Sequence, residues 1–352
     1  MLSVAPARVI PMLYGALPHE SAQAACAVLR RHDLPYVAWP QLPQRHFYER
    51  SIVQASWGLP GLVLDASQRR VYVTRETTLA AIPQYTIAFM QKTRVQSAEW
   101  TQHEAAGLRE LMADIESLGP DVGIKGQMLG PISLAAQLTD EHQQPLLADP
   151  ALFEGVVIHC CLRARLQADA VMRTNRPAMV CLEEPFYDVM RSPFMTIDRD
   201  ELLVALARVV LAIPCQRALT LRCGTPLGDI VQLPIDVLIV THWEDHLVDD
   251  RMIADLVVAL GSGMRVGIGV VPVDKMDYAT TVHTDAHVYA IIQRFLAAGA
   301  TPAELRRGLV IAPSQSLGQA PVDQAEAVIA QTCTTAAAVD GLLVQLIRGY
   351  TE

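Results

Sequence analysis

Short apolar stretches recur along the whole chain and alternate with longer segments in which apolar residues repeat at helical spacing. Stretches such as VLIV (237–240) are apolar at consecutive positions, which is typical of parallel strands buried on both faces. Eight of these stretches are predicted strands, over residues 9–14, 36–39, 121–126, 179–183, 217–222, 236–240, 265–271 and 308–312. Strands that alternate with helices in this way predict an α/β protein, a single (β/α)8 TIM barrel over residues 1–352.

Residues 61–74 depart from this alternation. Two arms of alternating apolar residues flank the polar turn ASQ, which predicts a hairpin. A helical region follows, with a break expected at Pro83 and a second part over 97–117. We expect hairpin and helices to elaborate the N-terminal part of the barrel. An open doubly wound sheet is the alternative, but no GxGxxG follows any predicted strand.

The amino-acid composition and net charge indicate which kinds of binding partner to expect. Apolar residues make up 51% of the chain and charged residues 18%, enough for a large core. The net charge is −9 and basic residues are not clustered, so neither nucleic acid nor a membrane surface is an expected partner. The seven cysteines contain no CxxC spacing, which is typical of a reducing compartment. We therefore expect a cytoplasmic protein with a small-molecule substrate, and a protein partner or a second copy of the chain remains an option.

Polar residues, glycine or proline follow most predicted strands. In a (β/α)8 barrel the carboxyl ends of the strands carry the active site. The segments at these ends read YGALPH (14–19), WPQLP (39–43), KGQMLGP (125–131), EEP (183–185), RCG (222–224), THWEDH (241–246), VPVDK (271–275) and PSQSLG (313–318). The sequence thus predicts one site built from several strand ends.

These segments together resemble the cobalamin-independent methionine synthase family, within the methionine synthase and uroporphyrinogen decarboxylase superfamily. GALPH is similar to the family's GS-x-P, and WPQLP…GLPG (39–61) to its WPQLP…E…Q…GLPG. KGQMLGPIS is similar to KGQ-x-TGPIS, EEP to DEP, RCG to H-x-CG and PSQSLG to PSCGLG. The resemblance implies a methyltransferase barrel in which zinc activates a thiol substrate.

The family's zinc ligands carry over poorly. Its histidine falls at Leu221, its acidic residue at or beside Thr241 and its last cysteine at Gln315, none of which is a ligand expected for zinc, and only Cys223 is kept. We expect either no cofactor or a relocated zinc, held by Cys223 with His242, Glu244 and His246.

The resemblance also suggests substrate-binding residues, namely Gly15, His19, Lys125, Gln127 and Glu183. Glu183 is the position that holds the substrate's amino group in the family, and an ion pair of Glu183 with Lys125 or Arg222 is the alternative.

Other candidates each have a plain structural alternative. Cys223 is a candidate catalytic thiol or a packed residue. The pair His283 and His287 can share a helix face or simply lie at the surface. Trp39 and Trp57 can form the wall of a ligand site or belong to the core.

Three functions remain open. The first is a diverged methyl or alkyl transferase for a small thiol or amino-acid-like substrate. The second is a zinc-free, non-catalytic relative that binds a metabolite or partner. The third is a lyase resembling uroporphyrinogen decarboxylase, although no arginine-rich loop lies near the N-terminus.

Overall fold

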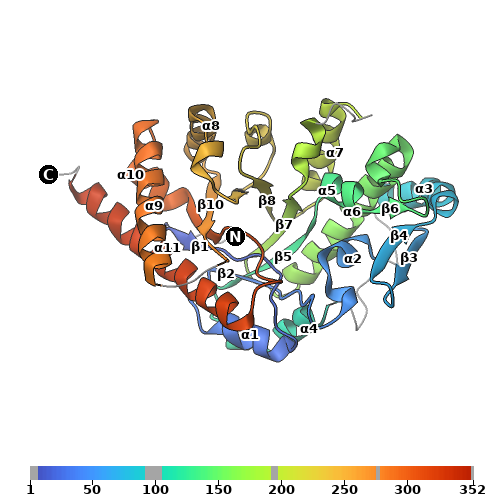
Figure 1. The fold of residues 1–352 in the computed structure, drawn as a ribbon, viewed down its shortest axis with the longest axis horizontal. Helices are drawn as coiled ribbons and strands as arrows, with labels where there is room; N and C mark the ends of the chain where they lie inside the picture. The colour runs from blue at the N-terminus through green and yellow to red at the C-terminus, as the bar shows by residue number, and fades with distance from the viewer. Residues whose placement is uncertain (1–6, 92–104, 192–196, 275–277, 350–352) are drawn as a thin grey trace.

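Eight parallel strands form one curled sheet, with helices along its outer side (Figure 1). The computed structural model describes residues 7–91, 105–191, 197–274 and 278–349. The order of the strands across the sheet is β1-β11-β10-β9-β8-β7-β5-β2. Their bounds are β1 Ile10–Pro11, β2 Tyr36–Ala38, β5 Gly123–Leu129, β7 Ala178–Glu184, β8 Gln216–Arg222, β9 Val237–Thr241, β10 Arg265–Val271 and β11 Leu309–Pro313.

Each of the eight predicted segments overlaps one of these strands, so the predicted series of parallel strands is confirmed. The bounds differ most for β1, which has two residues, and for β5, which continues to Leu129. The two edge strands are linked beyond their ends, where Gln41 N donates to Gly15 O and Leu17 N donates to Gln41 O, both at 2.9 Å. Closure of the sheet into a complete barrel stays a prediction.

Several of the helices begin at a residue whose side chain caps them. Asp149 accepts hydrogen bonds from Ala151 N and Leu152 N at the start of α6, and Thr301 forms a capping box with Glu304 at the start of α10. The helices are α1 Ala22–Arg30, α2 Ser51–Ser56, α3 Arg75–Met90, α4 Ala106–Ala113, α5 Pro131–Gln137, α6 Pro150–Met172, α7 Arg199–Leu211, α8 Asp250–Gly261, α9 Tyr278–Ala297, α10 Pro302–Gly308 and α11 Val322–Gly349.

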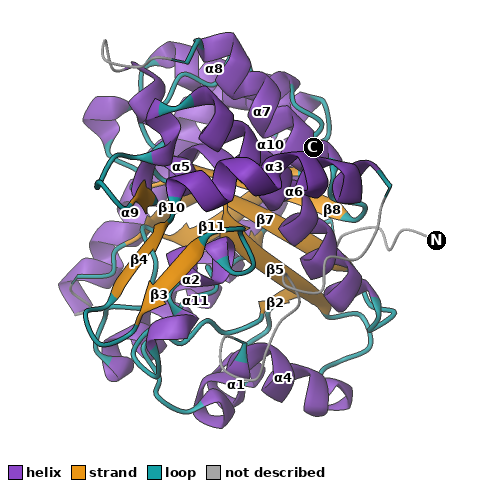
Figure 2. Cartoon of the chain, turned by 90° about the vertical axis from the view of Figure 1, so that its right-hand side faces the viewer, coloured by secondary structure: helices purple, strands orange, loops and turns teal. Residues whose placement is uncertain are grey.

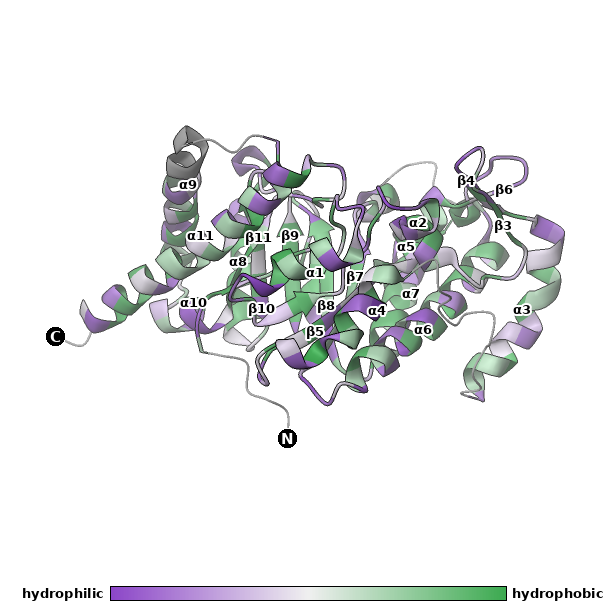
Figure 3. Ribbon diagram, turned by 90° about the horizontal axis from the view of Figure 1, so that it is seen from below, coloured by the Kyte–Doolittle hydropathy of each residue, from purple (hydrophilic) through white to green (hydrophobic). Residues whose placement is uncertain are grey.

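Alternate residues of the strands pack into two separate cores. One set faces the hollow of the sheet and includes Met12, Met179, Cys181 and Ile239. The other set packs against the helices in a much larger cluster. The strands are hydrophobic along most of their length (Figure 3), as expected for a sheet covered on both faces. A side chain's position in this alternation therefore decides whether it can reach the site inside the sheet.

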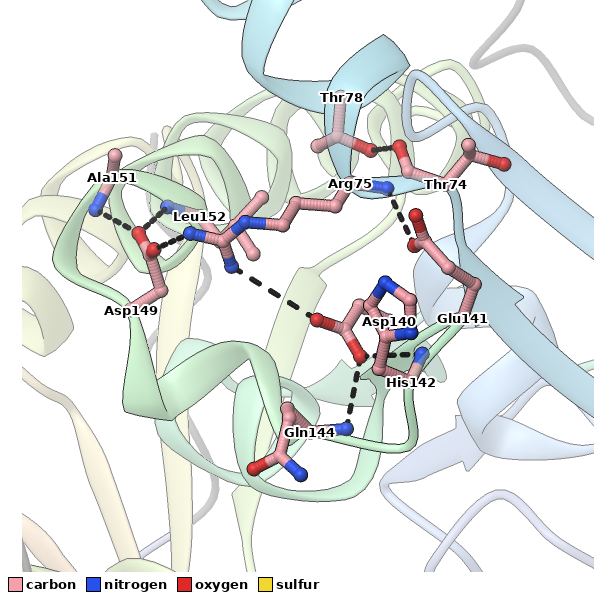
Figure 4. A network of polar contacts seen from close by, with 10 residues as sticks. All are labelled: Thr74, Arg75, Thr78, Asp140, Glu141, His142, Gln144, Asp149, Ala151 and Leu152. Atoms are coloured by element: carbon pink, nitrogen blue, oxygen red, sulfur yellow. Dashed lines mark hydrogen bonds and ion pairs between the residues drawn. The ribbon is translucent and has the colours of Figure 1, made fainter.

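The predicted hairpin is present as β3 (Leu62–Asp65) and β4 (Arg70–Val73), with β6 (Thr139–Asp140) as a third strand. It lies to one side of the main sheet (Figure 1) and in front of that sheet in the view of Figure 2. Arg75, at the start of α3, holds it in place (Figure 4). The Arg75 side chain pairs with Asp149 and lies 3.9 Å from Asp140, and its backbone N–H donates to Glu141 at 2.8 Å.

Two long helices, α3 and α11, have features that their sequences alone would misrepresent. The expected break at Pro83 is wrong, because α3 continues through this residue, which lacks only the backbone N–H. Helix α11 is long and apolar enough to cross a membrane, but 44% of its most apolar window is buried and it packs on β1 and β11. Asp340 of α11 accepts hydrogen bonds from Val9 N and Arg306 Nε, both at 3.0 Å, which ties the helix to the rest of the fold.

Candidate active site

A cavity of about 550 Å³ opens at the carboxyl ends of the strands, and we call it the mouth pocket. Residues from the ends of β7, β8 and β9 and from the segments after β1, β2, β10 and β11 line it. The polar side chains that line it include Tyr14, Gln41, Glu183, Thr241, His242 and Gln315. The pocket lies where the barrel pattern predicted the site, and its size suits a small molecule.

Glu183 is the carboxylate that β7 places in this pocket. It follows Met179 and Cys181 on the inward face of the strand, and it is partly exposed. Within the described part of the chain its side chain forms neither a hydrogen bond nor an ion pair; Arg222 is exposed and Lys125 is buried in the sheet interior. Burial raises the pKa of Glu183, and the charge of Lys125 opposes that shift. A carboxylate without a protein partner is suited to binding a cationic group.

Glu184, the next residue, has a structural role at the start of α5. It is fully buried on the opposite face of β7 and accepts hydrogen bonds from Ile132 N at 3.0 Å and Ser133 N at 2.7 Å. These bonds satisfy the free N–H groups at the start of α5. Burial raises the pKa of Glu184 to about 7, against the lowering effect of those hydrogen bonds. Of the two adjacent carboxylates, only Glu183 reaches the pocket.

A chain of hydrogen bonds crosses the opposite wall of the pocket. Gln315 Nε2 donates to Asp274 Oδ1 at 3.1 Å, and Gln315 Oε1 lies 3.2 Å from His242 Nε2. His242 Nδ1 lies 3.3 Å from Thr241 Oγ1, which donates to Leu221 O at 3.1 Å. The backbone of His242 is left-handed, with φ of 50°. The residues here come from the ends of β9, β10 and β11, so three strands position them.

A buried polar network supports the third wall. Gln41 lines the pocket, and its Nε2 donates to Gln54 Oε1 at 2.6 Å. Gln54 Nε2 donates to Glu49 Oε2 at 3.2 Å, and Glu49 also accepts from Ala106 N at 3.0 Å. Burial raises the pKa of Glu49, while these backbone hydrogen bonds lower it. The network links the glutamine of WPQLP with the Glu and Gln that follow it before GLPG, and it fixes Gln41 at the pocket.

Gly15 and Gln127 lie together just outside the pocket lining. A Cβ on Gly15 would lie 2.1 Å from Gln127 Nε2, so only glycine fits there. Gln127 is fully buried and donates to Trp39 O at 2.8 Å. His19 lies apart from both, buried, with its Nε2 at 3.3 Å from Glu326 Oε1 of α11. The structure thus brings Gly15 and Gln127 together and leaves His19 elsewhere; among the predicted substrate residues, Glu183 lines the pocket.

The four candidate zinc ligands are not gathered into one site. Cys223 is buried in the large core and its Sγ donates to Glu244 O at 3.8 Å. His246 is exposed and lies 3.6 Å from the Glu244 carboxylate, while His242 bonds to Gln315 instead. Over the residues that the structure describes, no group of three or more His, Cys, Asp or Glu side chains is placed to hold a metal ion.

Cys223 also does not show the properties of an activated thiol. Burial raises the pKa of the Cys223 thiol, although its contacts with the backbone of Glu244 and Gly224 act in the other direction. Cys223 directly follows β8, where Leu219 and Leu221 belong to the same large core. Thr220 and the end of Leu221 line the pocket, whereas Cys223 is not among the residues that line it. The environment of Cys223 is thus that of a thiol packed in the core, the alternative to a catalytic thiol.

The remaining candidates lie away from the pocket. Trp39 is buried, and Trp57 stacks edge-on against Tyr48 and lines a separate cavity beside the hairpin. His287 lies 3.0 Å from Asp245 near the surface, and the side chain of His283 falls outside the described residues. The sequence reasoning missed Gln41, Thr220 and Asp274 as pocket residues.

Comparison with solved structures supports the fold. A protein from Listeria monocytogenes, provisionally assigned as a vitamin-B12-independent methionine synthase, superposes with a TM-score of 0.55 at 11% identity, over 94% of this chain and 99% of that one. A methyltransferase from Methanosarcina mazei superposes with a TM-score of 0.52 at 16% identity, over 90% and 85%. No protein-family model and no curated protein matches the sequence. The chain therefore shares the fold of methionine-synthase-like and methyltransferase proteins.

Proposed function

We propose that the chain is a methyltransferase-type enzyme that acts on a small thiol or amino-acid-like substrate bound in the mouth pocket. The observation that carries the proposal is Glu183, a carboxylate on the inward face of β7 that, among the residues the structure describes, forms no hydrogen bond or ion pair. An ammonium group placed against it would gain a charge-assisted hydrogen bond in a partly desolvated site. This assigns Glu183 the binding of the substrate's amine.

The fold comparisons support the reaction class of this proposal, since the two superposed proteins carry methionine synthase and methyltransferase names. We further propose that the curled sheet closes into a (β/α)8 barrel. The hydrogen bonds of Gln41 with Gly15 and Leu17, between the segments that follow the two edge strands, support closure at the mouth. A closed mouth places Glu183 and His242 on walls of the same pocket.

Zinc does not fit the residues present at the family positions. Leu221 is a fully buried core residue, Gln315 is held by Asp274, and the Cys223 thiol is directed to Glu244 O. An amide and an aliphatic side chain cannot replace a thiolate and an imidazole as zinc ligands. No step of the proposed reaction is therefore assigned to zinc, and activation of the substrate falls to the pocket's own side chains.

The proposal can be tested by incubating the protein with an aminothiol and methyl donors of three classes: a sulfonium, a quaternary ammonium and an N-methylated pterin. Mass spectrometry then detects the S-methylated product. We expect product with at least one donor, and a large loss of product in Glu183→Gln. Absence of product with all donors, although the aminothiol binds, would favour the non-catalytic alternative.

That alternative has one observation of its own, the occupation of the three family ligand positions by Leu221, Thr241 and Gln315. A binding protein would keep the pocket and the Glu183 contact without a transfer step. Turnover, and not affinity, separates the two functions.

A further inference from the structure

A second cavity, of about 370 Å³, lies between the hairpin and the start of α2, and we call it the basic cavity. Three arginines line it: Arg50, directly before α2, and Arg69 and Arg70, at the turn of the hairpin (Figure 1). Arg50 is distant from the other two in the sequence, and the position of the hairpin beside α2 brings all three together. The other residues that line the cavity carry no charge, namely Ile52, Val71, Tyr72, Gln137 and Thr139.

No carboxylate in the described part of the chain forms an ion pair with these three guanidinium groups. Arg50 lies over the ring of Phe47 and Arg70 over the ring of Tyr72, with 5.9 Å and 5.4 Å from Cζ to the ring centre. A guanidinium that lies over a ring still has its N–H donors available at its edge for a further partner. The arginines are therefore able to bind an anion without first breaking an ion pair.

The carboxylates nearest to the basic cavity are engaged elsewhere. Asp65 is opposite Arg70 in the register of β3 and β4, but its Oδ1 accepts a hydrogen bond from Ser67 Oγ at 2.5 Å within the turn. Asp140 of β6, on the other side of β4, lies 3.9 Å from Arg75. Three like charges thus converge on one cavity in a chain whose net charge is −9, and their mutual repulsion favours an anionic ligand.

The backbone of Arg69 also indicates a role for its side chain. Its φ of 52° lies in the left-handed region, which glycine or asparagine adopts more easily than arginine does. The conformation of the turn therefore does not explain an arginine at this position. A contribution of the guanidinium to the charge of the cavity does explain it.

The basic cavity and the mouth pocket meet at Gln137. This residue, at the end of α5, lines both of them, and Ser51, which follows Arg50, lines the mouth pocket. Gln137 Nε2 donates to Ser133 O at 3.0 Å, which holds the side chain where the two cavities meet. A molecule seated in the mouth pocket can therefore extend past Gln137 to the arginines.

We propose that the basic cavity binds a phosphate group at the far end of the molecule whose amine lies at Glu183. The inference rests on the proposed function, because it extends the substrate of the mouth pocket by a phosphate-bearing arm. A phosphate dianion offsets more of the three positive charges than a carboxylate does, and its oxygens match the fork of donors on a guanidinium. The substrate class is thus a small amino compound that ends in a phosphate.

Calorimetry with ω-aminoalkyl phosphates of increasing chain length tests this arrangement, because these probes carry only the amine and the phosphate. Two linked groups that bind at the same time reinforce each other when the linker spans both sites. We therefore expect the best chain length to bind about 100-fold more tightly than the alkylamine of the same length. The ω-amino carboxylate of that length should bind more weakly than the phosphate.

Variants separate the two ends of the probe. Arg50→Gln and Arg70→Gln should each weaken binding of the best aminoalkyl phosphate by about tenfold or more, since each removes a charged hydrogen-bond donor. Both should leave unchanged the affinity for cysteamine, which carries only an amine and a thiol. Glu183→Gln should weaken the binding of both probes. Arg173→Gln, which removes an exposed arginine directly after α6, is the control for net charge and should bind as the wild type does.

An aminoalkyl phosphate series that binds no more tightly than the alkylamines overturns the inference and leaves the proposed function standing. Arginine variants that bind these phosphates as the wild type does have the same consequence. Binding of inorganic phosphate with no gain from linking also overturns the inference, because the cavity would then serve a separate anion. Equal affinity for the carboxylate and the phosphate overturns the assignment of phosphate. Equal affinity of wild type and Glu183→Gln for cysteamine and for the phosphates overturns both the inference and the proposed function.

Discussion

Glu183 and Glu184 are neighbours in the chain, yet their carboxylates lie on opposite faces of β7. Glu183 lines the mouth pocket, whereas Glu184 is fully buried against the start of α5. The strand's alternation places one carboxylate at the pocket and the other in the interior of the fold. Substitutions at the two positions should therefore change different properties, ligand affinity for Glu183 and the free energy of unfolding for Glu184.

For Glu184 we predict a specific pH dependence of stability. Its pKa of about 7 in the folded protein lies above the ordinary value of 4.5, so the folded state holds the proton more tightly than the unfolded state. The resulting stabilisation is fully present below the ordinary pKa and is lost as pH rises through about 7. Glu184→Gln mimics the protonated form and removes this dependence, which corresponds to roughly 3 kcal/mol at most.

Urea unfolding of the wild type and of Glu184→Gln at about pH 5 and about pH 8 measures this difference. The wild type should lose stability relative to the variant at the higher pH. A difference between the two proteins that does not change with pH would contradict the assigned burial of an ionisable Glu184.

Gly130 should not tolerate a side chain, because the buried carboxylate of Glu184 occupies the space beside it. A Cβ there would lie 2.3 Å from Glu184 Oε1, and Glu184 cannot move without losing its bonds to α5. Gly130→Ala should lower the free energy of unfolding by about 1–3 kcal/mol. Gly341, inside α11 with no atom near its Cβ position, is the control, and Gly341→Ala should stabilise by about 0.5–1 kcal/mol. Equal effects at both positions would show that the Glu184 contact is not tight.

Cys223 should behave as a packed thiol. Burial raises its pKa and the side chain is only 5% exposed, so iodoacetamide should modify it slowly in the native protein and quickly after unfolding. Cys223→Ala should leave aminothiol affinity within about twofold, because the thiol does not line the pocket. Rapid native alkylation of Cys223, blocked by bound cysteamine, would place it in the site after all.

The sequence predicts the series of strands well because apolar runs mark them plainly, and the barrel rule then locates the pocket. It predicts individual site residues less well, because a one-residue change in alternation moves a side chain to the other face. Cys223 is the clearest case. It follows Leu219 and Leu221 at alternate positions, and all three belong to the large core, whereas Ala218 belongs to the inward cluster. The alternation in β8 therefore predicts the position of Cys223 better than the family motif does.

Other site features depend on contacts that no local pattern carries. Asp274 and Gln315 follow different strands, and only the folded sheet brings them to His242. The side chains of the predicted zinc set lie apart in this structure for a similar reason: spacing along the chain does not fix where loop side chains point, and His246 is exposed.

The central claim, that Glu183 binds the amine of a small substrate in the mouth pocket, is tested most directly by calorimetry with cysteamine. Glu183→Gln removes the carboxylate but keeps the shape, and we predict a loss of about 2–5 kcal/mol in binding free energy. Glu201→Gln, which neutralises an exposed carboxylate on α7, is the control for net charge and should bind as the wild type does. Ethanethiol, which lacks the amine, should not distinguish wild type from Glu183→Gln. Equal cysteamine affinity in wild type and Glu183→Gln would contradict the account.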